Sequence, residues 1–124
     1  MKKILIDSHV FLWWHEDSDR LSRRHKKLID DPESLIFISI ASLYELYLKS
    51  GLGKLDIPDT IEEDLIKHDM EILRISFKHL NEFRQLPRHH KDPLDRMIIS
   101  QAIADNIPVI SYDDWFKAYD IELL

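Results

Sequence analysis

The sequence contains no cysteine and only two glycines among its 124 residues. Without cysteine there can be no disulfide, no thiol nucleophile and no thiolate metal site. No apolar run approaches the roughly 18 residues that a membrane-spanning helix needs. The first residues, Met-Lys-Lys-Ile-Leu-Ile-Asp, turn polar too soon for a secretory signal peptide. We therefore expect a cytoplasmic protein that does not enter a membrane.

What is present is typical of a globular chain, with 44% hydrophobic and 32% charged residues. We expect a single domain, residues 1–124, that buries about two-thirds of its unfolded surface. The net charge of −6 argues mildly against a nucleic-acid partner. If four acids share one metal site, however, the remaining surface is close to neutral. It also carries a basic cluster at Arg20, Arg23, Arg24, Lys26 and Lys27.

Short apolar runs alternate with helical patterns along the whole chain. The predicted strands are residues 2–7, 34–39, 71–75, 107–111 and 121–124. The predicted helices are residues 10–14, 21–30, 40–50, 60–69, 77–85 and 93–106, with a further helical turn at 113–118 and Gly51 as a helix C-cap. This alternation, with continuously apolar strands, predicts an α/β sandwich around a mostly parallel sheet.

Residues 88–102 place a carboxylate where a helix normally presents an apolar side chain. Asp92 is a favourable N-cap, and Pro93 suits the first helical position. Asp95 then falls on the same stripe as Ile98 and Ile99, its neighbours one turn on. A carboxylate pointing toward a core or cleft is costly unless it is paired or binds a metal.

Three further acids are predicted to meet Asp95 at one end of the sheet, since ligands of open α/β folds bind beyond the carboxyl ends of the strands. Asp7 ends the first strand, Glu45 lies early in the helix after the second, and Asp113 follows a late strand. With no cysteine and no lysine expected to converge there, these acids predict an oxygen-ligand site for Mg²⁺ or Mn²⁺.

Such a site suits hydrolysis of a phosphodiester bond, because bound cations activate a water and stabilise charge on the phosphate. The hydroxyls of Ser8 and Ser111 are predicted to orient Asp7 and Asp113. Basic side chains near the acids are predicted to bind substrate phosphate, namely His90, Lys91 and Arg96.

Four blocks of the sequence together resemble PIN-domain ribonucleases, specifically the VapC-type toxins of bacterial toxin–antitoxin pairs. The blocks are ILIDSHVFLWW (4–14), SIASLYELYLKSGLGKL (39–55), LPRHHKDPLDRMIISQA (86–102) and IPVISYDDWFKAYDIELL (107–124). They run from end to end of the chain, and the third is the most specific.

The resemblance implies that the metal-binding acids are Asp7, Glu45, Asp95 and Asp113, with Asp92 supporting them. It also implies Mg²⁺- or Mn²⁺-dependent cleavage of RNA, a homodimer, and neutralisation by a small VapB-like antitoxin laid across a groove. Departures from the family pattern are mild. Serine replaces the commoner threonine at Ser8 and Ser111, which keeps both hydroxyls, and Tyr44 and Leu94 replace tryptophan and phenylalanine.

Two other classes of function compete with this interpretation. One is a purely binding role, in which the fold captures an antitoxin or another partner without catalysis. The other is a phospho-acceptor receiver domain, which needs an acidic pair after the first strand and a lysine after a late one. Here Ser8 and His9 follow Asp7, and the first lysine after Ser111 is Lys117. A haloacid-dehalogenase-type phosphatase needs an Asp at position 9, where this chain has His9.

Overall fold

The computed structural model describes every residue from Met1 to Leu124. Its sheet has four strands, all parallel, in the order β3-β2-β1-β4. The strands are β1 (Lys2–Ile6), β2 (Ser34–Ser39), β3 (Glu71–Leu73) and β4 (Val109–Ile110). The central strand β1 pairs on one side with β2 and on the other with β4. The carboxyl ends of these three strands therefore lie side by side.

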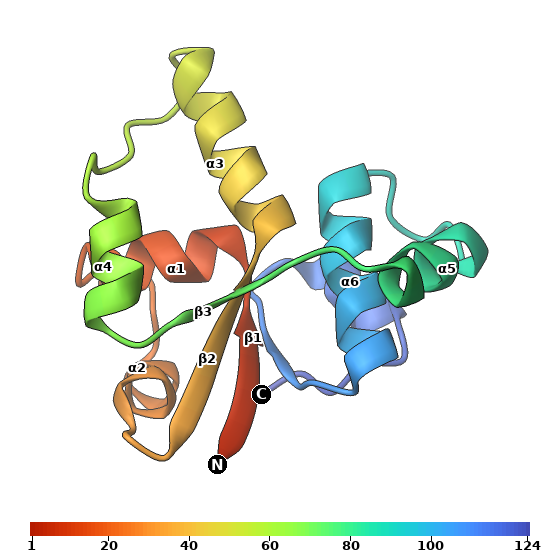
Figure 1. The fold of residues 1–124 in the computed structure, drawn as a ribbon, viewed down its shortest axis with the longest axis horizontal. Helices are drawn as coiled ribbons and strands as arrows, with labels where there is room; N and C mark the ends of the chain where they lie inside the picture. The colour runs from red at the N-terminus through yellow and green to blue at the C-terminus, as the bar shows by residue number, and fades with distance from the viewer.

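Helices cover both faces of the sheet, which confirms the predicted α/β sandwich (Figure 1). One face carries α1 (Ser8–His15), α2 (Arg23–Asp30) and α4 (Ile61–Lys67). The other carries α5 (Phe77–Gln85), α6 (Pro93–Asp105) and the 3₁₀ helix η1 (Asp114–Ala118). Helix α3 (Ile40–Gly51) extends past the carboxyl edge of the sheet (Figure 1). None of these helices combines the length and apolarity needed to cross a bilayer.

Alternating side chains of the strands divide the core into two parts. Ile4 and Ile6 of β1 are fully buried in the cluster that includes α1 and α4. Leu5, between them, is fully buried in the second cluster, with Ile98 of α6 and Phe116 of η1. Successive residues of a strand point to opposite faces, so β1 is buried on both sides. An apolar run without alternation is the pattern that such a strand requires.

Several predicted boundaries were wrong by a few residues, for local reasons. The first helix begins at Ser8 because Asp7 is its N-cap rather than part of the strand. Helix α3 continues through Gly51, and the left-handed backbone lies two residues later at Gly53 (φ 72°). The predicted last strand, 121–124, is reduced to one parallel bridge between Leu123 and Val109, because the tail bonds to a single strand residue.

The carboxyl ends of β2 and β3 are tied to α6 by Gln101, which is fully buried. Its side-chain oxygen accepts a hydrogen bond from Ser39 Oγ. Its amide nitrogen donates to the carbonyl oxygens of Leu73 and Arg74, each at 3.3 Å. Since buried polar groups are expensive when unpaired, this side chain fixes the spacing between the sheet edge and α6.

We expect Gln101→Leu to lower the free energy of unfolding by about 1–3 kcal/mol, because it removes the acceptor of the Ser39 hydroxyl and the donor to two carbonyls. The matched control is Ser42→Ala, since the buried Ser42 hydroxyl has no hydrogen-bond partner and its loss should cost little. Urea denaturation of the two variants measures the difference. Equal stability of Gln101→Leu and the native protein would contradict this account.

Candidate metal centre

Asp7 and Asp113 follow the adjacent strands β1 and β4, and each caps the helix that comes next. Asp7 Oδ1 accepts the Val10 N–H at 2.9 Å, and Asp113 Oδ1 accepts the Trp115 N–H at 3.0 Å. Ser111 links the two acids, since its Oγ donates to Asp7 Oδ2 and accepts the Asp113 N–H at 3.1 Å. Helix capping thus holds both carboxylates at the sheet edge.

Glu45 reaches the same edge from α3 and is buried. Ser8 Oγ donates to Glu45 Oε1 at 3.2 Å, so Ser8 orients this acid rather than Asp7. Lys49, one helical turn on, donates from Nζ to Glu45 Oε2 at 2.7 Å. That hydrogen bond raises the pKa of Lys49, and the charges of Asp92 and Asp95 raise it further. The expectation that no lysine converges on the acids was therefore wrong.

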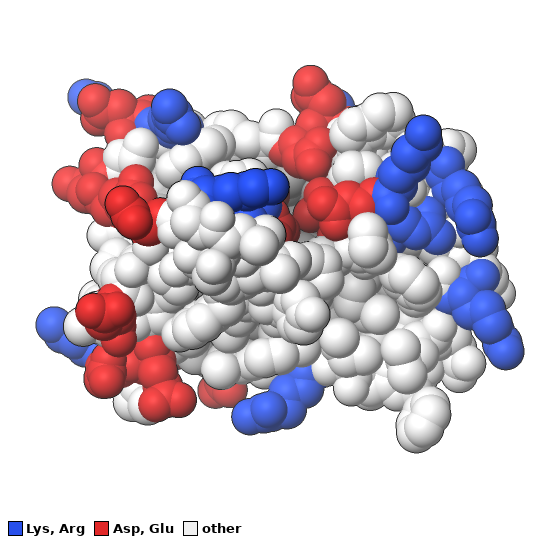
Figure 2. All heavy atoms as spheres, turned by 90° about the horizontal axis from the view of Figure 1, so that it is seen from above, with Lys and Arg blue, Asp and Glu red and all other residues white.

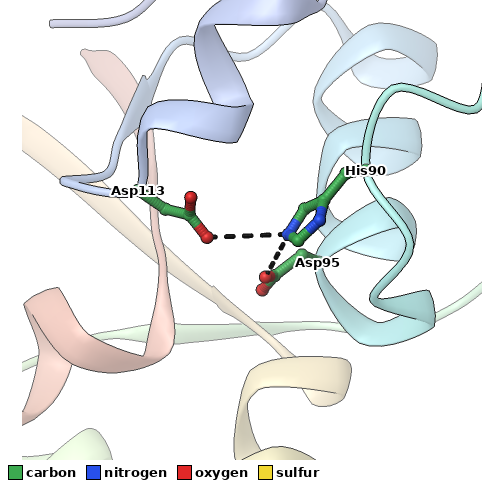
Figure 3. Close-up of side chains that lie close together, drawn as sticks. All are labelled: His90, Asp95 and Asp113. Atoms are coloured by element: carbon green, nitrogen blue, oxygen red, sulfur yellow. Dashed lines mark hydrogen bonds and ion pairs between the residues drawn. The ribbon is translucent and has the colours of Figure 1, made fainter.

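His90, in the loop between α5 and α6, connects Asp95 to Asp113 (Figure 3). Its Nε2 lies 2.8 Å from Asp95 Oδ2 and 3.6 Å from Asp113 Oδ2. The imidazole stacks on Trp115, with ring centroids 5.6 Å apart and planes at 12°. This side chain occupies the space between the two carboxylates, so it is part of the acid cluster.

The phosphate-binding role predicted for Arg96 does not fit its position. Arg96 is buried, and its guanidinium donates to the carbonyl oxygens of Leu86, Pro87 and His90. It also donates to the Tyr119 hydroxyl at 3.4 Å. The three carbonyls belong to the loop before α6, and the Tyr119 hydroxyl is itself hydrogen-bonded to that loop. Arg96 therefore holds the loop that carries His90, and its guanidinium is occupied by these hydrogen bonds.

Two other predicted residues lie at the start of α6. Asp92 is the N-cap, and its Oδ1 accepts the N–H groups of Leu94 and Asp95. Asp92 therefore fixes the first turn of α6, which carries Asp95, and its negative charge raises the pKa of Asp95. Lys91, next to it, is exposed and forms no ion pair. It remains available to a ligand that approaches the acids.

Crowding of carboxylates in a buried place shifts their proton affinities. Burial raises the pKa of Asp7, against the hydrogen bonds from Ser111 and Val10, which lower it. Burial likewise raises the pKa of Asp95 to about 7, and the negative charges of Asp92 and Glu45 add to the shift. The hydrogen bond from His90 only partly opposes it. A site that favours protonated carboxylates is one that a bound cation would stabilise.

The donor atoms suit a small divalent cation. His90, Asp95 and Asp113 each offer one ligand atom, all within 4.8 Å of one another, whereas the predicted ligands Asp7 and Glu45 lie outside this group. Carboxylate oxygens are the ligands that Mg²⁺ and Mn²⁺ prefer, and an imidazole nitrogen is also compatible with Mn²⁺. Viewed onto this end of the molecule, acidic side chains gather near the middle of the surface, with basic ones on either side (Figure 2).

Sequence reasoning missed Lys49, Trp115 and Tyr119. The spacing of Glu45 and Lys49, four residues apart on a helix, was a signal that could have identified their ion pair. No local pattern indicated that Trp115 stacks on His90. Nor did one indicate that the Tyr119 hydroxyl accepts the His90 N–H at 2.8 Å and donates to Pro87 O.

The fold and this arrangement of acids define the class of protein. The model of the PIN domain family matches residues 4–122. The chain therefore belongs to the PIN domain family. A comparison with curated protein sequences finds no match.

Solved structures share the fold at low sequence identity. The chain is similar to VapBC2 of Rickettsia felis bound to a DNA fragment from its promoter (20% identity, TM-score 0.72, covering 98% of this chain and 97% of that one). It is similar to VapBC-1 of nontypeable Haemophilus influenzae (14% identity, TM-score 0.68, covering 98% of this chain and 96% of that one). It is also similar to VapBC-5 of Mycobacterium tuberculosis, a member of the VapBC family of toxin–antitoxin systems (18% identity, TM-score 0.63, covering 100% of each chain).

The raised pKa of Asp95 predicts how metal-free protein responds to pH. The folded state binds this proton more tightly than the unfolded chain, where the pKa is near 3.8. Its contribution to stability is therefore complete below about pH 4 and is lost as the pH rises to about 7. We expect Asp95→Asn in EDTA to melt a few degrees above the native protein at pH 8 and to show a flatter pH profile.

Calorimetry from pH 4 to 8 measures both changes, and Mg²⁺ should raise the melting temperature of the native protein more than that of Asp95→Asn. A variant that melts well below the native protein in EDTA at pH 8 would assign Asp95 a structural role as the partner of His90.

Proposed function

We propose that this protein is a VapC-like endoribonuclease toxin that hydrolyses RNA phosphodiester bonds with Mg²⁺ or Mn²⁺. One observation carries the proposal: hydrogen bonds and an ion pair link three carboxylates from separate parts of the chain at the carboxyl edge of the sheet, and the charge of a fourth acts on them. Ser111 joins Asp7 to Asp113, and His90 joins Asp113 to Asp95. Glu45 adds its negative charge to those of Asp7 and Asp95.

In this proposal Asp7, Glu45, Asp95 and Asp113 hold the cation. When bound, the cation supplies a water of lowered pKa and neutralises charge on the phosphate. Ser111 and Ser8 keep the carboxylates of Asp7 and Glu45 oriented through their hydrogen bonds. Lys49 balances one negative charge of the cluster.

The substrate phosphate meets side chains of the loop before α6. His90 lies between Asp95 and Asp113, so its imidazole is placed to donate to a phosphate oxygen at the acids. The exposed ammonium of Lys91 adds positive charge at the rim. Arg96 acts indirectly, because its hydrogen bonds to Pro87 O and His90 O hold this loop in place.

The partner we propose is an antitoxin, because the similar structures include VapBC toxin–antitoxin complexes. A groove of about 640 Å³ between α3 and α4 offers it an apolar surface. Three large side chains of this groove are strongly exposed: Tyr44, Tyr47 and Ile66. Contiguous exposed apolar surface on a soluble protein marks an interaction site.

We further propose that the toxin acts in the cytoplasm and that it forms a homodimer.

RNA cleavage tests the nuclease assignment. We expect Asp7→Asn and Asp113→Asn to reduce metal-dependent cleavage of total RNA by about 100-fold or more, since even the outer partners of metal ligands cost about 10–100-fold. The control is Asp114→Asn, because this neighbour is exposed and pairs only with Lys117 at the surface. Gel analysis with Mg²⁺, Mn²⁺ or EDTA gives the readout. No cleavage by native protein whose melting temperature rises with metal would favour the purely binding role.

A second test concerns the groove. We expect the double variant Tyr47→Asp, Ile66→Asp to weaken antitoxin binding by about 100-fold, because charge is placed in a buried apolar contact. RNA cleavage should remain, since neither side chain contacts the acids. The control is Phe77→Asp on α5, an apolar residue that is 83% exposed and lies outside the groove. Copurification with the co-expressed antitoxin measures binding, and unchanged copurification of the double variant would assign the antitoxin another surface.

A further inference from the structure

A second hollow lies directly beside the acids, on the side of α1. Its volume is about 250 Å³, and five residues line it: Asp7, His9, Trp13, Tyr112 and Asp113. Two of the four acids proposed to hold the cation, Asp7 and Asp113, thus also line this pocket. The pocket is smaller than the roughly 300–1,000 Å³ that drug-sized ligands occupy. Its size suits one planar ring system.

Three of the five residues that line the pocket carry rings. His9 and Trp13 are four residues apart on α1, so they share one helix face, and their rings stack with centroids 6.0 Å apart. Tyr112 meets the Trp13 ring edge-on at 5.1 Å. Trp13 is half-buried, whereas His9 and Tyr112 are exposed. This part of the pocket is therefore aromatic and open to solvent.

Tyr112 is held in this position by partners far from it in the sequence. Its hydroxyl accepts the Ser22 N–H at 2.9 Å and lies 2.6 Å from His25 Nδ1. The other ring nitrogen of His25 lies 2.8 Å from the carbonyl oxygen of Leu124. The tyrosine ring is therefore fixed before any ligand arrives, which lowers the entropic cost of binding against it.

We propose that this pocket binds the base of the nucleotide next to the scissile phosphate. This inference rests on the proposed RNA cleavage and names the part of the substrate that the site recognises. Proteins that bind single-stranded RNA stack its bases on aromatic side chains and meet its phosphates with positive charge. Because Asp7 and Asp113 border both sites, a phosphate at the acids places the base of the same nucleotide at Trp13 and Tyr112.

The charge beyond the pocket agrees with a nucleic-acid strand. Ser22 and His25, which hold Tyr112, lie at the start of α2. The same helix presents the exposed basic side chains of Arg23, Arg24 and Lys27, which line a shallow depression. Proteins that bind single strands combine aromatic side chains, on which bases stack, with basic side chains that meet the phosphates.

Uncharged nucleosides test the pocket without metal and without catalysis. We would titrate adenosine, cytidine, guanosine and uridine into ¹⁵N-labelled protein in EDTA and follow the three indole N–H signals, with ribose as the control. At least one nucleoside should shift the Trp13 signal in a saturable way, with a smaller response at Trp115 and none at Trp14, which bonds to Asp30 in another part of the molecule. Ribose should shift none. No shift at Trp13, or equal shifts of all three indoles, would overturn the proposal.

Variants of Trp13 give a second readout. Trp13→Ala should abolish the nucleoside response at Tyr112 and raise KM for RNA by about 10-fold with kcat little changed. Trp13→Phe, which keeps a ring, should retain most of the binding. The matched control is Trp14→Ala, adjacent in sequence and equally half-buried but outside the pocket. Nucleoside binding that survives Trp13→Ala would overturn the proposal.

Failure of the pocket and failure of the nuclease give different results. If nucleosides bind at Trp13 but RNA is not cleaved, the pocket binds bases and the protein is not a nuclease. The proposed role of the bound base in cleavage is then wrong as well. Cleavage that is insensitive to Trp13→Ala, with no nucleoside response, would keep the nuclease and remove the pocket.

Discussion

Negative charge gathered at the carboxyl edge of the sheet is the constraint on which the rest of the structure depends. Buried carboxylates close to one another repel strongly because little water screens them. Each of them is accordingly met by a donor: Asp7 by Ser111, Glu45 by Lys49, and Asp95 by His90. These donors come from different segments, so the charge cluster organises the loops and helix starts around it.

The parallel sheet is what makes such a cluster possible. With β1 between β2 and β4, three strands deliver their following residues to one edge. Arg96 and Tyr119 then fix the loop before α6, so that His90 faces the acids. The hydrogen bonds from the buried Arg96 guanidinium to carbonyl groups hold this loop in one position. Without them, repulsion between the nearby carboxylates would displace it.

Helix α3 couples the proposed catalytic and antitoxin surfaces. Glu45 and Lys49 face the acid cluster, whereas Tyr44 and Tyr47 of the same helix line the apolar groove. A partner seated in the groove would therefore touch the helix that carries Glu45, one of the proposed metal ligands. The aromatic pocket around Trp13 lies on another side of the acids, so the three surfaces use different elements around one charge centre.

The sequence by itself determined the types of most elements, because apolar periodicity, the Asp92-Pro93 start of α6 and the apolar runs of β1 and β2 are local properties. It also singled out the acids by their places after strands and at helix starts. Only the tertiary structure decided which donors meet them. The buried role of Arg96, the place of His90 between two acids and the bracing of Tyr112 by His25 depend on contacts between distant segments, which no local pattern encodes.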